Sequence, residues 1–107
     1  MVYNLIFALV VFTTIDFITC IIRGVQEKTL SSNRGRDFIL KKIMIFLLIA
    51  ATYILEAFVL REDTGNTITT TVISFYILNE GIGILENATA LGLPVPGILK
   101  EVFSNKK

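Results

Sequence analysis

The sequence of 107 residues has no histidine, no tryptophan, two prolines and a single cysteine, Cys20. One cysteine cannot form an internal disulfide, and a chain without histidine or a cysteine cluster offers no zinc ligands. Charged residues make up only 18% of the chain and hydrophobic residues 53%, whereas soluble domains carry roughly 25% charged residues. These deficits exclude a disulfide-stapled secreted module, a basic nucleic-acid-binding domain and a disordered chain. No nucleophile–base pair, metal set or phosphate loop indicates an enzyme, so no metal or other cofactor is expected.

Three long apolar runs occupy residues 2–22, 43–60 and 67–91, and none of them contains lysine or arginine. A helix needs about 20 residues to cross a hydrocarbon core about 30 Å thick, so each run can span a membrane, the second barely. The free energy of inserting the third run into a membrane by itself is near zero. Its ten Leu, Ile, Phe or Val residues favour insertion, whereas two Glu, two Asn and five Thr oppose it. We therefore predict one all-α domain over residues 1–107, an integral membrane protein with three transmembrane helices. The first run lacks a basic leading segment and is interpreted as an uncleaved span rather than a signal peptide.

The connections between the runs predict the orientation. Residues 23–42 hold six basic and two acidic residues, the connection 61–66 has one basic and two acidic residues, and the tail 93–107 is again basic. The positive-inside bias places the loop 23–42 and the tail in the cytoplasm and the N-terminus outside. The basic side chains expected to set the topology or to reach anionic headgroups are Arg34, Arg36, Lys41 and Lys42. Gly35 lies in a polar turn where positive φ is expected, and Cys20 is a small apolar residue or a palmitoylation site.

A polar stripe marks the third run. At about 100° per residue, one arc of about 120° contains Tyr76, Asn79, Glu80, Gly83, Glu86, Asn87 and Ala90. Unsatisfied polar groups cost several kcal/mol in hydrocarbon, so this stripe must meet protein or water. It either bonds to the other two spans of its own chain or drives association with other copies, and we favour association. Gly81 and Gly83 permit close approach between helices.

Four acids lie within the runs: Asp16, Glu56, Glu80 and Glu86. No cation lies within the runs, so we expect these acids to be neutral while dry and to line an aqueous path once water enters. The residues of the polar stripe and Asp16 are therefore the candidates to line an oligomer interface or a pore. Glu56 is expected near the outer interface.

Several short motifs recur in one family of membrane proteins. They are Asp16-Phe17-Ile18-Thr19, Leu30-Ser31-Ser32 with Gly35, Lys41-Lys42, Tyr76-Ile77-Leu78-Asn79-Glu80-Gly81, Ile84-Leu85-Glu86-Asn87, and Gly92, Pro94, Pro96 and Leu99. On these motifs the chain resembles the toxin secretion/phage lysis holin family over roughly residues 10–103. Cys20 departs from the pattern, because the family usually has glycine there.

The resemblance implies a holin, a multi-pass protein of the bacterial cytoplasmic membrane. Such proteins accumulate among the membrane lipids and then form homo-oligomeric lesions that release an endolysin or, in some relatives, a toxin. The alternatives are a small proton- or cation-coupled transporter or channel subunit, and a scaffold that anchors a partner through the basic loop and the tail. No nucleic-acid partner is expected.

Overall fold

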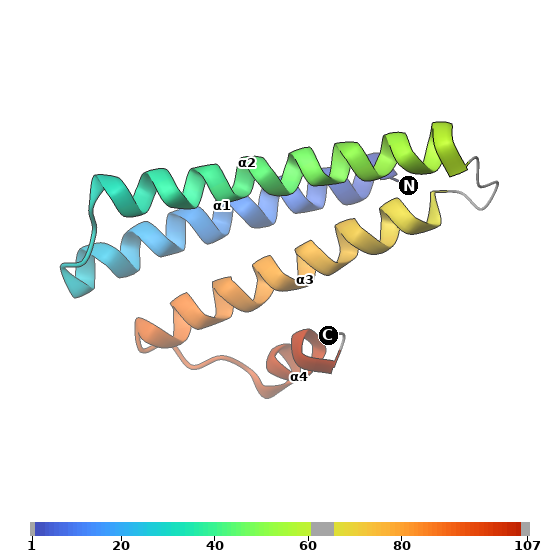
Figure 1. Cartoon of the computed structure of the whole chain (residues 1–107). Coiled ribbons are helices and arrows are strands. Elements are labelled where there is room, and N and C mark those ends of the chain that lie inside the picture. Colours follow the sequence, from blue (N-terminus) through green and yellow to red (C-terminus); the bar gives the residue numbers. More distant parts are fainter. Residues whose placement is uncertain (1, 61–65, 106–107) are drawn as a thin grey trace.

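The computed structural model describes residues 2–60 and 66–105, and within these ranges every regular element is helical (Figure 1). The elements are α1 (Val2–Glu27), α2 (Ser32–Ile54) with its π-helical continuation η1 (Leu55–Leu60), α3 (Thr67–Ala90) and α4 (Gly97–Asn105). Three of the described helices, Val2–Glu27, Ser32–Leu60 and Thr67–Ala90, are long and apolar enough to cross a membrane, and the third is the least apolar. The prediction of an all-helical chain with three such helices is confirmed.

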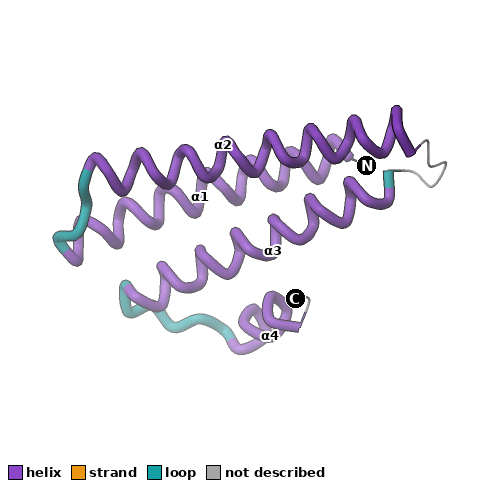
Figure 2. The backbone as a smooth tube through the Cα atoms, in the orientation of Figure 1, coloured by secondary structure: helices purple, strands orange, loops and turns teal. Residues whose placement is uncertain are grey.

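The three long helices lie side by side, each antiparallel to the one before it, and α4 folds back along α3 (Figures 1 and 2). The molecule measures 49 × 34 × 18 Å, and α3 packs most extensively on α1, whereas α1 and α2 approach each other less closely. Only Leu9, Ile49 and Ile73 form the fully buried apolar core of the described chain. Most other large apolar side chains stay exposed, as suits a lipid environment.

The connection between α1 and α2 is much shorter than the loop predicted at residues 23–42. Lys28 ends α1 with a φ of 59°, and the amide of Thr29 donates to the carbonyl of Gly24 at 2.9 Å, the pattern of a Schellman cap. Ser31 then caps α2, because its hydroxyl accepts a bond from the Arg34 amide at 3.2 Å. Positive φ at Gly35 was a wrong expectation, since Gly35 lies inside α2 and Lys28 takes that conformation instead.

The side chain of Glu56 joins η1 to the start of α3. Its side chain is only 1% exposed, and its carboxylate accepts bonds from the Ile68 amide at 2.8 Å, the Thr69 amide at 2.9 Å and the Thr69 hydroxyl at 2.8 Å. Asn66 makes no side-chain capping bond, so the carboxylate of the preceding helix caps α3 in its place. Glu56 lies near the end of the second span, and its position at the outer interface stays a prediction. The connection at 61–65, used for the orientation, lies outside the described residues.

We expect Glu56→Leu to weaken the contact between η1 and α3, because three donors, two of them buried, lose their acceptor. Amide exchange at residues 68 and 69 should become several-fold faster in the purified protein, whereas Thr71→Val, which removes an exposed hydroxyl on the same helix, should leave it unchanged. Equal exchange in Glu56→Leu and the wild type would contradict the capping role.

The end of α3 agrees with the sequence. Gly92 has a φ of 88°, and the Leu93 amide donates to the Ala88 carbonyl at 3.1 Å, so the helix stops at the glycine that precedes the two prolines. Beyond the prolines the chain forms the nine-residue α4. Its Phe103 ring packs on Gly81 and lies 6.5 Å, centroid to centroid, from the ring of Phe12.

A side chain at position 81 has no room beside this ring. A Cβ atom there would approach Phe103 more closely than real Cβ atoms approach their neighbours. We therefore expect Gly81→Ala to displace α4 and to speed tryptic cleavage after Lys100. Gly35→Ala is the control, because no atom lies within 4 Å of a Cβ atom at that position. Unchanged cleavage of Gly81→Ala would mean that α4 does not depend on this contact.

Candidate functional site

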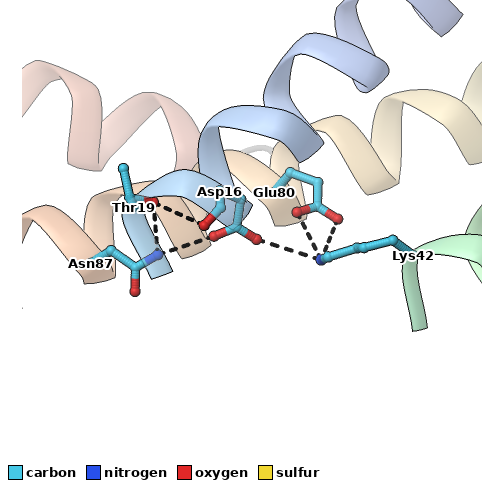
Figure 3. A network of polar contacts seen from close by, with 5 residues as sticks. All are labelled: Asp16, Thr19, Lys42, Glu80 and Asn87. Carbon is cyan, nitrogen blue, oxygen red and sulfur yellow. Dashed lines mark hydrogen bonds and ion pairs between the residues drawn. The ribbon is translucent and has the colours of Figure 1, made fainter. Parts of the chain in front are cut away.

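A network of polar contacts joins the three long helices (Figure 3). The ammonium of Lys42 on α2 donates to both carboxylate oxygens of Glu80 on α3, at 2.7 and 2.9 Å. The same ammonium lies 3.5 Å from Oδ2 of Asp16 on α1. Glu80 is 1% and Asp16 7% exposed, so one cation holds two buried carboxylates from two different helices.

This layer lies deep within the helices. Glu80 follows Thr67 by 13 residues, which places it about 20 Å from that end of α3 at 1.5 Å per residue. A hydrocarbon core is about 30 Å thick, so the ion pairs fall inside the span. The prediction that the acids have no intramembrane cation is therefore wrong for Asp16 and Glu80. The apolar run was counted from Ile43, but the helix begins at Ser32 and turns Lys42 inward.

Two further features position Lys42. Its ammonium lies 4.5 Å from the centroid of the Phe38 ring, one turn earlier on α2, in a cation–π contact. A Cβ atom on Gly83 would lie 3.0 Å from an oxygen of Asp16, so the glycine lets α1 bring this carboxylate against α3. The close approach expected at Gly81 and Gly83 is thus observed at both positions, against α4 and α1 respectively.

Asn87 extends the network toward the α1–α2 connection. Its Nδ2 donates to Oδ1 of Asp16 at 3.2 Å and to the Thr19 hydroxyl at 2.9 Å, and its Oδ1 accepts from Arg23 Nη1 at 3.3 Å. Arg23 also pairs with Glu27 at 3.3 Å. Sequence reasoning missed Thr19 and Arg23, although their spacing from Asp16 puts all three on one helical face.

The predicted stripe divides into two faces. Glu80 and Asn87 are buried against α1 and α2, and Tyr76 is partly buried against the apolar core. Asn79 and Glu86 are exposed and form no hydrogen bond or ion pair within residues 2–60 and 66–105. For Glu80 and Asn87 the single-chain alternative holds, whereas the exposed flank of Asn79 and Glu86 finds no partner in its own described chain.

The basic residues predicted for the membrane surface also differ from one another. Lys42 is turned into the ion pairs, Arg36 lies 3.9 Å from Asp37, and Arg34 donates to the Thr29 carbonyl at 3.3 Å. Lys41 is exposed and has no ion pair or hydrogen bond in the part of the chain that the structure describes. Arg34 and Lys41 therefore remain available to an anion.

The comparisons with known proteins decide the family. A model described as the bacteriophage holin family matches residues 1–107. The chain belongs to the bacteriophage holin family. The family consists of membrane proteins that are not enzymes, and the resemblance found from the sequence motifs is confirmed.

Relatives of this holin-family chain occur in bacteria and in a phage. An uncharacterized 14.9 kDa protein of Clostridium perfringens is 41% identical over 103 residues, which cover 92% of this chain and 76% of that protein. A Listeria monocytogenes protein is 37% identical over 99 residues, covering 92% and 69%. A protein of Bacillus phage phi105 named as a probable holin is 27% identical over 93 residues, covering 87% and 67%. No solved structure matches the chain.

Proposed function

We propose that this protein is a holin, which accumulates in the bacterial cytoplasmic membrane and then opens lesions that release an endolysin or a toxin. Membership of the bacteriophage holin family supports this function. The observation that carries it is a polar layer of Asp16, Lys42 and Glu80 buried between helices long enough to span a membrane. Such a layer can exist in a dry and a wetted arrangement.

In the resting state the chain is N-out and C-in, with three spans and the basic connection in the cytoplasm. The carboxylates and Asn87 are satisfied within one copy, which supports harmless insertion as a closed subunit. The buried carboxylates and Asn87 then cost little, because each has a partner.

Copies associate through the exposed flank of α3. Asn79 lies about 18 Å along α3 from Thr67, within the span, and its amide has no partner in its own described chain. An uncompensated amide in hydrocarbon costs several kcal/mol, and a second copy can supply the missing bonds. Glu86 lies two turns further along the same flank. Because association depends on concentration, a lesion can appear abruptly once enough copies have accumulated.

Opening follows when α3 separates from α1 and α2. The ion pairs between Lys42 and the two acids then give way to hydration, and Asp16, Glu80 and Asn87 of several copies line the aqueous lesion. Tyr76 and Gly83 lie along the same side of α3 and complete that lining. Hydration of the separated charges offsets the loss of the ion pairs, because water solvates an isolated charge far better than hydrocarbon does.

A second candidate is a proton- or cation-coupled transporter. It is favoured by one observation, a lysine held between two buried carboxylates, because ionisable residues within a membrane commonly mark ion pathways. A transporter would keep the membrane intact while it works.

Induction of the protein in bacteria, with membrane potential followed over time, separates the two. We expect the potential to remain normal during accumulation, then to collapse abruptly, with a co-expressed endolysin released at the same moment. A potential that persists at high expression while a small substrate is transported would contradict the holin proposal.

A further inference from the structure

A cavity of about 360 Å³ opens where α1 meets α2, beside the Lys28–Ser31 connection. We propose that this cavity binds the headgroup of an anionic phospholipid, with one acyl chain lying in the groove between α1 and α2. The site goes beyond lesion formation and does not depend on it.

The charges at the cavity suit a phosphate group. Arg23, Arg34 and Lys41 line it, together with the acids Glu27 and Asp37. Arg23 is engaged by Glu27, whereas Arg34 bonds only a backbone carbonyl and Lys41 bonds no described residue. Two cations from one face of α2 thus remain for an anion, and guanidinium and ammonium groups are the usual phosphate ligands.

A second, apolar cavity of about 400 Å³ adjoins the first and is lined by α1 and α2. Phe17 and Phe38 line both cavities, and their ring centroids are 5.3 Å apart. The groove beyond them is walled by Phe46 and Leu47, and it exists because α1 and α2 approach each other less closely than α1 and α3. A basic head cavity next to an apolar groove matches an amphipathic lipid better than a free phosphate.

The bound lipid would touch the polar layer. Arg23 and Asn87 line the head cavity, and Lys42 lines the groove. An occupied site therefore fills the space between α1 and α2 next to the ion pairs and favours the closed arrangement of the helices.

The test is retention of lipid by the purified full chain in detergent, measured by native mass spectrometry. We expect phosphatidylglycerol to be retained about tenfold more than phosphatidylcholine with the same acyl chains, a difference of about 1.4 kcal/mol. The double variant Arg34→Gln/Lys41→Gln should lose most of this preference. Arg36→Gln is the matched control, because Arg36 carries the same charge on the same helix but does not line the cavity. Circular dichroism verifies that each variant stays helical.

Two competing sources of the anion are distinguished in the same experiment. Inorganic phosphate and glycerophosphoglycerol, added at millimolar concentration, should not displace the lipid, because neither fills the groove. Displacement by either would assign the cavity to a soluble anion and overturn the proposal. Equal retention of the two lipids, or an equal loss in Arg36→Gln and the double variant, would also overturn it.

Discussion

Lys42→Leu is expected to open lesions earlier than the wild type at equal protein level. The change leaves Asp16 and Glu80 buried without their cation, and removing one partner of a buried ion pair costs about 3–5 kcal/mol. Because the lysine joins α2 to α1 and α3, that loss falls on the closed arrangement and not on a hydrated one. The onset of potential collapse, with immunoblots of membrane fractions, measures the effect.

A basic residue outside the polar layer and outside the lipid cavity provides the control for this variant. Arg36 is exposed, lies 3.9 Å from the equally exposed Asp37 and does not line the cavity, so Arg36→Leu should change stability by no more than about 0.5 kcal/mol and leave the timing near that of the wild type. A variant that removes both acids together with the lysine, Asp16→Asn/Lys42→Met/Glu80→Gln, should regain much of the closed-state stability, because no uncompensated charge remains. Identical timing of Arg36→Leu and Lys42→Leu would show that the ion pairs do not hold the subunit closed.

Asn79→Leu is expected to insert and accumulate normally but to fail to permeabilise the membrane. Asn79 makes no bond within its own described chain, so the closed subunit loses nothing when the amide is removed. The associated state loses the hydrogen bonds that a second copy would supply. A leucine side chain gains little by moving from lipid into an interface between helices, because both surroundings are apolar. The measurement is the time course of membrane potential in cells that express equal amounts of the two proteins.

An apolar substitution on the same flank is the control for that experiment. Phe75 lies one turn before Asn79 and is 53% exposed, and Phe75→Leu removes no polar group. We expect Phe75→Leu to keep wild-type timing. If Asn79→Leu also keeps wild-type timing, lesion formation does not require the Asn79 amide.

The three spans and the end of α3 could be predicted because they depend on local patterns, whereas the connection between α1 and α2 is much shorter than predicted. The lengths of the apolar runs predict the three long helices, and the third run ends at residue 91, next to the glycine at which α3 stops. The orientation in the membrane and the association of copies are still predictions.

The inward turn of Lys42 could not be predicted from the same patterns. Counting residues in an apolar run treats a lysine at its edge as interfacial, whereas the long side chain reaches two acids on other helices. The capping of α3 by Glu56 could not be predicted for a similar reason, because its partners are donors at the start of the next helix. At about 100° per residue, Asn79 and Glu80 fall on one face of α3. Only the packing of α1 and α2 against that helix decides that Glu80 is buried and Asn79 exposed.

Cross-linking through the exposed flank of α3 tests the central claim most directly, namely that copies associate there while the buried layer is satisfied within each. In a Cys20→Ser background, Phe75→Cys on the flank and Met44→Cys on α2 present similarly exposed positions, 53% and 63% in the native residues. We predict that disulfide-linked dimers form through position 75 as lesions open, and far fewer through position 44. A chain that stays monomeric at position 75 while the membrane potential collapses would contradict the account.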